Sequence, residues 1–288
     1  MRDYVLVCDS TGDLPADIIK ELGIKIIPFS YSIKDEPFYY YIDERDDIKG
    51  FYDKLRAGDM PVTSQVNPTT YKDFFKEIVE EGKDVLYMCF SSGLSGSYQS
   101  ARLGVDMLEE KYPDAKVVVV DTLAASVGEG LYMYLAAKKK AEGMDIDELA
   151  TWIEDNRLNV RHWFMVEDLF HLSRGGRLSA VGAVVGSALK IKPILSVDEE
   201  GKLVVKAKTR GTGKALDYII SKVVEEGGDL ASLVGVIGHA DDMEKAEKIK
   251  SMAVEAGMKE ENLMITPIGP IIGTHVGAGM AAIAFLME

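Results

Sequence analysis

Residues 85–97 read VLYMCFSSGLSGS, an apolar run followed at once by a segment of serine and glycine. The first six residues lack polar alternation, which is typical of a strand buried on both faces of a parallel sheet. A helical pattern over 98–111 follows the polar segment. A buried strand, a short polar loop and a helix together indicate an α/β protein.

The same unit occurs on either side of this stretch. Apolar runs at 4–8, 24–28 and 117–120 predict further strands, and the segments 14–22 and 125–141 predict helices. We therefore expect a parallel sheet covered by helices on both faces. In such sheets ligands bind at the carboxyl ends of the strands, where the polar loops lie.

The second half of the chain changes character. Residues 193–197 and 202–206 flank Asp-Glu-Glu-Gly, a pattern that predicts an antiparallel hairpin. Three further strands are expected in this half, together with a helix over 242–256. These strands are 233–237, 263–266 and 280–286. The interpretation is two domains, an N-terminal parallel-sheet α/β domain over 1–160 and a C-terminal α/β domain with a mixed or antiparallel sheet over 161–288.

Composition excludes several classes of protein. The 288 residues carry a net charge of −14, which disfavours binding to DNA or RNA. No apolar run approaches the ~18 residues of a membrane helix, and the N-terminus does not resemble a signal peptide. Cys8 and Cys89 end apolar runs, so we expect buried free thiols and neither a disulfide framework nor a metal site. These features predict a cytoplasmic protein.

The serine-rich segment has two interpretations. Ser92, Gly93, Ser95 and Gly96 precede a helix whose N-terminus offers free N–H groups, a combination that favours a carboxylate or phosphate. The alternative is an ordinary serine cap with glycines for the turn. The segment fits neither the nucleophile elbow, which needs a final glycine, nor a Walker loop, which needs Gly-Lys-Ser/Thr.

Other polar segments share this character. Polar residues follow or flank several expected strands, and together they favour a polar pocket at one sheet edge. Strand-end hydrogen bonding explains Asp9 and Asp121 better than a role in this pocket. His275 lies in a glycine-rich segment, interpreted as a loop, that includes Gly273 and Thr274. Arg174 and Arg177 flank a Gly-Gly pair and can clamp an anion or remain solvated. The remaining candidates, all expected in loops at this edge of the sheet, are Ser10, Thr11, Thr63, Ser64 and Thr122. The apolar segment 180–189 predicts a buried helix or the wall of an apolar cavity.

The order and spacing of these motifs resemble the DegV family of fatty-acid-binding proteins over essentially the whole chain. The motifs are DSTGDLP at 9–15, TSQ at 63–65, SSGLSGSY at 91–98, RGGRLS at 174–179 and GTHVG at 273–277. Two departures are Val66-Asn67 and Ala278, where the family pattern has Pro-Ser and Pro. Neither departure removes a side chain assigned to the ligand.

The resemblance implies two α/β domains with a long-chain fatty acid such as palmitate buried between them, and no other cofactor. By analogy, Thr63 and Ser95 bind the carboxylate directly and His275 supports them. Ser64, Ser92, Gly93 and Gly96 would lie beside the carboxylate. The residues expected nearby are Ser10, Thr11, Thr122, Gly273, Thr274, Arg174 and Arg177. Arg210 matches a position implicated in docking a partner fatty-acid kinase, which forms an acyl phosphate for phospholipid synthesis.

Physical chemistry agrees with an enclosed tail. Burying the ~15 tail carbons of palmitate is worth about 12 kcal/mol before ordering and association costs. Hydroxyls and helix N–H groups offset the cost of burying the carboxylate. The expected function is therefore a lipid carrier without catalysis of its own. Two alternatives stay open, a serine esterase or phosphotransferase that uses Ser95 with His275, and a sensor of small anions.

Overall fold

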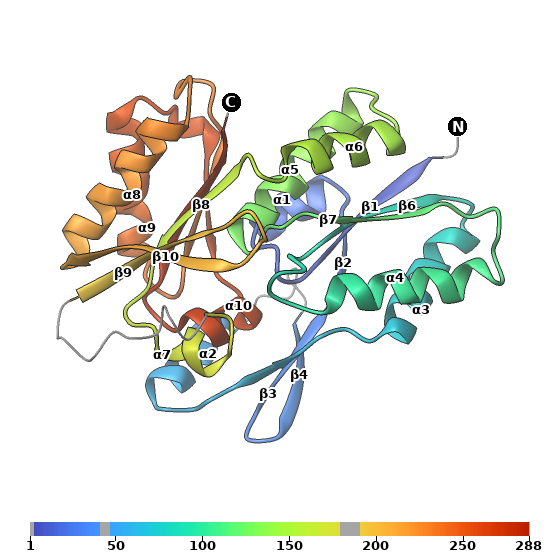
Figure 1. Cartoon of the computed structure of the whole chain (residues 1–288), viewed down its shortest axis with the longest axis horizontal. Coiled ribbons are helices and arrows are strands. Elements are labelled where there is room, and N and C mark those ends of the chain that lie inside the picture. Colours follow the sequence, from blue (N-terminus) through green and yellow to red (C-terminus); the bar gives the residue numbers. More distant parts are fainter. Residues whose placement is uncertain (1–2, 41–46, 179–190, 288) are drawn as a thin grey trace.

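The structure is a computed structural model that describes residues 3–40, 47–178 and 191–287. It is an α/β fold built on a parallel four-stranded sheet and a mixed six-stranded sheet, with a small antiparallel sheet below them (Figure 1). The predicted fold class is confirmed. The expectation for 180–189 falls outside the described residues.

The N-terminal sheet contains the strands that the apolar runs predict. Its strands are all parallel, in the order β2 (Lys25–Ile27), β1 (Tyr4–Asp9), β6 (Asp84–Cys89) and β7 (Val117–Asp121). Every residue of β6 is buried, as expected for a strand covered on both faces. The helices of this half are α1 (Ala16–Glu21), α3 (Pro68–Glu80), α4 (Ser97–Glu109), α5 (Val127–Ala141) and α6 (Ile146–Asn156). Figure 1 shows α3 and α4 on one face of the sheet and α5 and α6 on the other.

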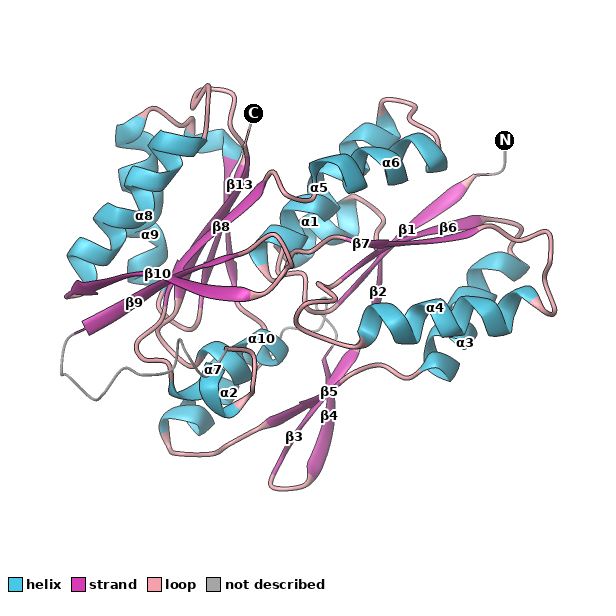
Figure 2. Cartoon of the chain, in the orientation of Figure 1, coloured by secondary structure: helices cyan, strands magenta, loops and turns pink. Residues whose placement is uncertain are grey.

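The C-terminal sheet is mixed. Its order is β10 (Leu203–Arg210), β9 (Ile191–Val197), β8 (Val160–Met165), β13 (Ala281–Leu286), β11 (Gly235–His239) and β12 (Leu263–Pro267). The predicted β9–β10 hairpin is antiparallel, whereas β11 and β12 run parallel. Helices α8 (Thr212–Glu226) and α9 (Met243–Ala256) cover its outer face, and the short 3-10 helix η1 (Glu260–Asn262) leads into β12 (Figure 2).

A third sheet was not predicted. It is antiparallel, in the order β4 (Glu36–Tyr40), β3 (Phe29–Ile33) and β5 (Val62–Ser64), and Figure 2 shows it projecting below the main body. The helices near it are α2 (Ile48–Arg56), α7 (Phe170–Arg174) and α10 (Pro270–Val276). Its strands are short and carry polar side chains, so they lack the apolar run that marks the other strands.

Helix α5 joins the two halves. It packs on β1 and β6 of the parallel sheet and on β8, β11 and β13 of the mixed sheet. One continuous apolar core therefore includes Val85 of the first sheet and Ala282 of the second, while a second core lies under α8 and α9. The division of the chain near residue 160 stays a prediction.

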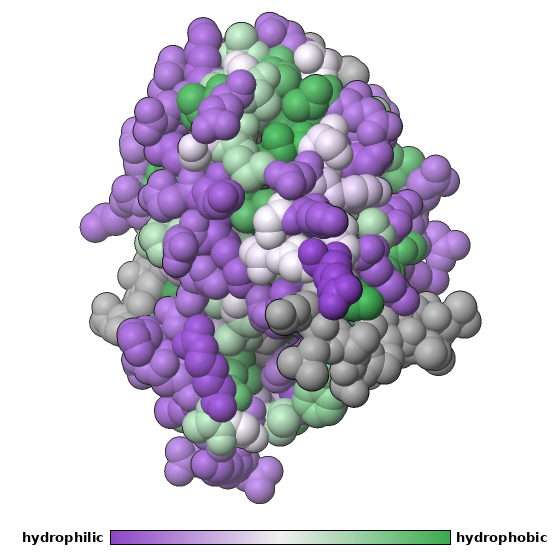
Figure 3. All heavy atoms as spheres, turned by 90° about the vertical axis from the view of Figure 1, so that its left-hand side faces the viewer, coloured by the Kyte–Doolittle hydropathy of each residue, from purple (hydrophilic) through white to green (hydrophobic). Residues whose placement is uncertain are grey.

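The surface is largely hydrophilic on the face formed by the C-terminal half, where apolar residues occur in scattered groups (Figure 3). Within the described residues, no helix combines the length and apolarity needed to cross a bilayer. Cys8 and Cys89 are buried free thiols, as predicted.

Candidate functional site

A cavity lies where the parallel sheet, the mixed sheet and the small sheet meet. Most of its wall is apolar and buried, and one end carries hydroxyl groups. The apolar wall includes Phe29, Phe90, Val127, Phe164, Ile271 and Ala282. The polar end includes Thr63, Ser64, Ser95, Arg177 and His275. This end is less buried than the wall, so it lies nearest to solvent.

Thr63 and His275 are in contact although they are 212 residues apart in the sequence. Thr63 Oγ1 lies 2.9 Å from His275 Nε2. Thr63 lies in β5, paired with Tyr31 of β3, so its predicted position in a loop at the edge of the parallel sheet was wrong. His275 lies in α10 and not in a loop, because Pro270 begins a helix that continues through the glycine of this segment.

Gly175 is required where the ring of His275 packs. A Cβ atom at this position would stand 2.3 Å from His275 Nδ1, so only glycine fits without moving the ring. Nδ1 is buried and has no hydrogen-bond partner among the described residues. A hydrogen on Nδ1 would therefore be unsatisfied, which favours the tautomer with its hydrogen on Nε2. Nε2–H then donates to Thr63, and the Thr63 hydroxyl hydrogen is left for a ligand.

The electrostatic environment keeps His275 neutral. Burial lowers its pKa to about 4, and the positive charges of Arg177 and Arg174 act in the same direction. A neutral imidazole at ordinary pH is a hydrogen-bond donor and not a counter-ion for a bound anion.

The stability of the ligand-free protein should depend on His275 between about pH 4 and pH 6.5. The unfolded chain binds a proton at its usual pKa of 6.5, whereas the folded chain takes it up only near pH 4. Stability is therefore lost as the pH falls through this window, by up to roughly 3 kcal/mol from this group. Urea denaturation of wild type and His275→Gln at pH 7 and pH 5 tests this. The variant should lose less stability on acidification, and equal losses would contradict the assignment.

Ser95 is fixed by its neighbours at the start of α4. Its Oγ lies 2.8 Å from Ser97 Oγ and accepts a hydrogen bond from the Ser97 N–H at 3.2 Å. The structure places Ser95 and His275 on the same cavity, but the hydroxyl of Ser95 is bonded to Ser97 and the imidazole to Thr63.

Arg174 and Arg177 hydrogen-bond to the backbone at the polar end of the cavity. Arg174 Nη2 donates to the carbonyl of Pro61 at 2.9 Å, two residues before Thr63. Arg177 Nε donates to the carbonyl of Leu94 at 3.3 Å, immediately before Ser95. Together with Gly175, which accommodates His275, this motif holds the segments that carry the three polar side chains.

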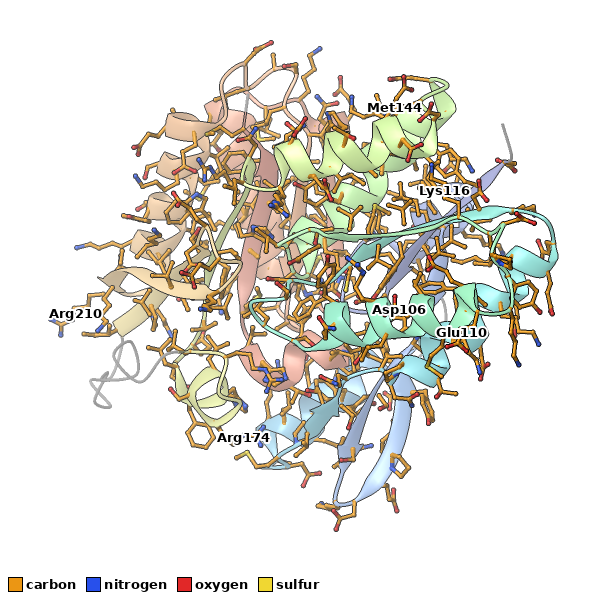
Figure 4. The ribbon with its side chains drawn as sticks, turned by 45° about the vertical axis from the view of Figure 1, so that its right-hand side comes forward. Asp106, Glu110, Lys116, Met144, Arg174 and Arg210 are labelled. Carbon is orange, nitrogen blue, oxygen red and sulfur yellow. The ribbon has the colours of Figure 1, made fainter. Side chains whose placement is uncertain are left out.

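Several expected site residues do not line the cavity. The Ser92 N–H donates to Asp121 Oδ1 and the Gly93 N–H donates to Ser91 Oγ. Gly96 packs against Gln65. The others outside the lining support nearby backbone or pack closely, and they are Ser10, Thr122, Gly273, Thr274 and Arg174. Arg210 lies exposed at the end of β10, as Figure 4 shows, and is not among the lining residues. Thr11 does line the cavity.

The sequence alone did not identify other lining residues. Gln65 and Ser126 add polar groups, and His162 lines the wall from β8 with a pKa that burial lowers to about 4. Gln65 ends the TSQ motif but was given no role, and nothing in the local sequence of Ser126 or His162 marks them, because only the packing of the sheets brings them to the cavity. Among the described residues, no group of three or more His, Cys, Asp or Glu side chains is arranged to hold a metal.

Known proteins of one family match nearly the whole chain in sequence and in fold. Residues 4–288 match the family model described as "Uncharacterised protein, DegV family". A DegV domain-containing protein of Clostridium perfringens is 40% identical over 286 residues, covering 99% of this chain and 98% of the relative. A DegV lipid-binding protein of Thermotoga maritima has a similar structure, with a TM-score of 0.89, 29% identity and coverage of 99% and 98%. A fatty-acid-binding DegV protein of Thermus thermophilus gives a TM-score of 0.88, with 28% identity over 100% of both chains.

Proposed function

The chain belongs to the DegV family, and from this we propose that it binds a long-chain fatty acid such as palmitate and presents its carboxyl group to a partner kinase. The observation that carries the proposal is the cavity, which is apolar along most of its wall and carries hydroxyls at one end. Similar structures belong to proteins that bind lipid or fatty acid. An apolar wall ending in a few placed polar groups suits an acyl chain with a polar head.

The polar residues have distinct roles in this proposal. Thr63 and Ser95 contact the carboxyl group, and His275 holds Thr63 by its hydrogen bond. Ser64 lies beside them in the lining. Arg174 and Arg177 position the backbone next to Thr63 and Ser95 through their bonds to Pro61 and Leu94. Since these guanidinium groups are bonded to carbonyls, they are positioning residues and do not replace the hydroxyls.

The placement of the head group supports presentation to a second protein. The tail would lie against the buried wall, while Thr63 and Ser95 are only partly buried. The kinase would therefore approach the carboxyl oxygen without opening the tail cavity. The product, an acyl phosphate, would serve phospholipid synthesis in the cytoplasm.

Arg210 is proposed to dock the kinase. It is exposed at the end of β10 and is not among the residues that line the cavity (Figure 4). Arg210→Glu should leave palmitate affinity unchanged but slow phosphorylation of the bound acid by at least about tenfold, because a charge reversal in an interface turns attraction into repulsion. Arg102→Glu makes the same charge change on the exposed face of α4 and is the control. Equal kinase rates for both variants would exclude Arg210 from docking.

The geometry supports a carrier better than a hydrolase or phosphotransferase. A nucleophile needs a base within hydrogen-bond reach and a third group that orients the base. Ser95 is bonded to Ser97, and in the described part of the chain no carboxylate bonds to Nδ1 of His275. Incubation with acyl esters and, separately, with ATP should give no turnover.

A sensor of small anions is the second alternative. Such a protein would need the head-group site but not the apolar wall. An environment-sensitive apolar dye bound in the cavity should be displaced by palmitate and not by acetate. Displacement by both, or by neither, would contradict the proposed function.

A further inference from the structure

The cavity wall contains a second group of polar side chains, which come from other elements than the head-group residues. Thr11 follows β1, Ser126 precedes α5 and His162 lies in β8, and all three line the cavity. Each of them is at most 6% exposed. A plain acyl chain offers no hydrogen bond to such groups, so polar side chains in the wall of an apolar cavity call for a physical explanation.

The ring of His162 is held against the first turn of α5. A Cβ atom on Gly128 would stand 1.8 Å from His162 Nε2, so the glycine leaves the room that the ring occupies. The Ala125 N–H donates to the same nitrogen at 3.4 Å. On the other side, β8 is fixed in the mixed sheet, where His162 is paired with Ala284 of β13. The position of the ring therefore follows from the packing of α5 on this sheet.

The hydrogen of the His162 ring lies on Nδ1. Burial lowers the pKa of the ring to about 4, so the imidazole is neutral and has a single N–H group. Because the Ala125 N–H is directed at Nε2, that nitrogen accepts and the hydrogen is on the other one. Nδ1 is buried and has no hydrogen-bond partner among the described residues. A buried donor without an acceptor destabilises the protein unless a bound molecule supplies the acceptor.

Ser126 supplies an acceptor on the same wall. Its backbone has a φ of 54°, which is uncommon for a residue other than glycine, and Asp13 holds it there. The Asp13 N–H donates to the Ser126 carbonyl at 3.1 Å, and Ser126 Oγ donates to Asp13 Oδ2 at 2.7 Å. Since a hydroxyl has only one hydrogen, Ser126 Oγ can act towards the cavity only as an acceptor.

We propose that His162 and Ser126 form a subsite for a hydroxyl group on the acyl chain, so that the protein binds a hydroxylated long-chain fatty acid at least as tightly as the plain acid. The inference rests on the proposed function and deepens it by naming a class of ligand. The ligand hydroxyl accepts a hydrogen bond from His162 Nδ1–H and donates its own hydrogen to Ser126 Oγ. Both buried groups are then satisfied, and the ligand hydroxyl is not left unpaired.

The position of the hydroxyl group on the acyl chain decides the affinity. The ligands to compare are stearate and three stearic acids that carry one hydroxyl near the head, in the middle or near the end of the chain. One position should bind at least as tightly as stearate. The other positions should bind roughly tenfold or more weakly, because their hydroxyl is buried against apolar side chains without a partner. Dissociation constants are measured on the full chain by displacement of an apolar dye.

Three variants assign the preference to these side chains. His162→Phe keeps an aromatic ring but removes the donor, so the affinity for the favoured acid should fall by about tenfold while that for stearate changes much less. His162→Asn can place an amide N–H where Nδ1–H lies, and as the matched control it should keep the preference. Ser126→Ala removes the acceptor, should act in the same direction as His162→Phe, and serves if that variant does not fold.

Several outcomes would overturn the inference. In wild type these are weaker binding of every hydroxylated acid than of stearate, or equal binding of all three positions. A preference that survives in both His162→Phe and Ser126→Ala would exclude the subsite. Equal losses for stearate and the favoured acid in His162→Phe would place His162 at the head group instead. Failure to bind any of the acids, stearate included, would overturn the fatty-acid carrier itself, and this inference with it.

Discussion

Thr63→Val is expected to weaken palmitate binding by roughly 10- to 100-fold. The substitution keeps the volume of the side chain but removes the hydroxyl that donates to the head group and accepts from His275 Nε2. Loss of a hydrogen bond to a buried polar group costs about 1.5–3 kcal/mol when the partner is left unsatisfied. At about 1.4 kcal/mol per tenfold change, that is one to two orders of magnitude in the dissociation constant.

The matched control at this position is Thr63→Ser, which keeps the hydroxyl and should bind within a few-fold of wild type. Both variants preserve the β5 backbone pairing with β3. Dissociation constants for palmitate can be measured by displacement of an apolar dye. A Thr63→Val protein that binds palmitate as tightly as Thr63→Ser would exclude Thr63 from the head-group site.

Ala282→Phe is expected to abolish tight binding of long chains while sparing short ones. Ala282 is buried on β13 and lines the apolar wall, opposite Phe164 in the sheet register. A phenyl ring that displaces about four methylene groups removes about 3 kcal/mol of tail burial, or roughly 100-fold in palmitate affinity. Octanoate needs less of the cavity, so its affinity should change much less.

The comparison of the two acids separates a blocked cavity from a damaged fold. A misfolded variant would lose both ligands and would also melt early. The relevant quantity is the ratio of palmitate to octanoate affinity, measured on a variant whose thermal transition is still cooperative. An unchanged ratio would show that the acyl tail does not occupy the space in front of Ala282.

Most strands of the two main sheets could be predicted, because burial on two faces produces uniformly apolar runs in the sequence, but β8 (Val160–Met165) was not predicted. Residues 85–90 are uniformly apolar and form β6 almost as expected. The hairpin of β9 and β10 was predicted from a different feature, the turn residues between its two strands. Strand β5 has only three residues, two of them exposed, and offers no comparable signal. Thr63 was therefore recognised as a candidate site residue but expected in a loop, whereas it lies in β5.

The contacts that assemble the polar end depend on tertiary packing. Arg174 and Arg177 were recognisable as a motif, but their bonds to Pro61 and Leu94 join segments far apart in the chain. Helix α10 was not predicted, because it contains Gly273 and glycines flank it at both ends, and glycine is a poor helix former.

The most direct test of the carrier is native mass spectrometry of the purified chain, followed by organic extraction and fatty-acid analysis. The account predicts a complex with one long-chain fatty acid per chain, released on denaturation and identified in the extract. The protein stripped of lipid should regain the same mass shift when palmitate or oleate is added. A chain that is empty as purified and refuses both acids would contradict the account.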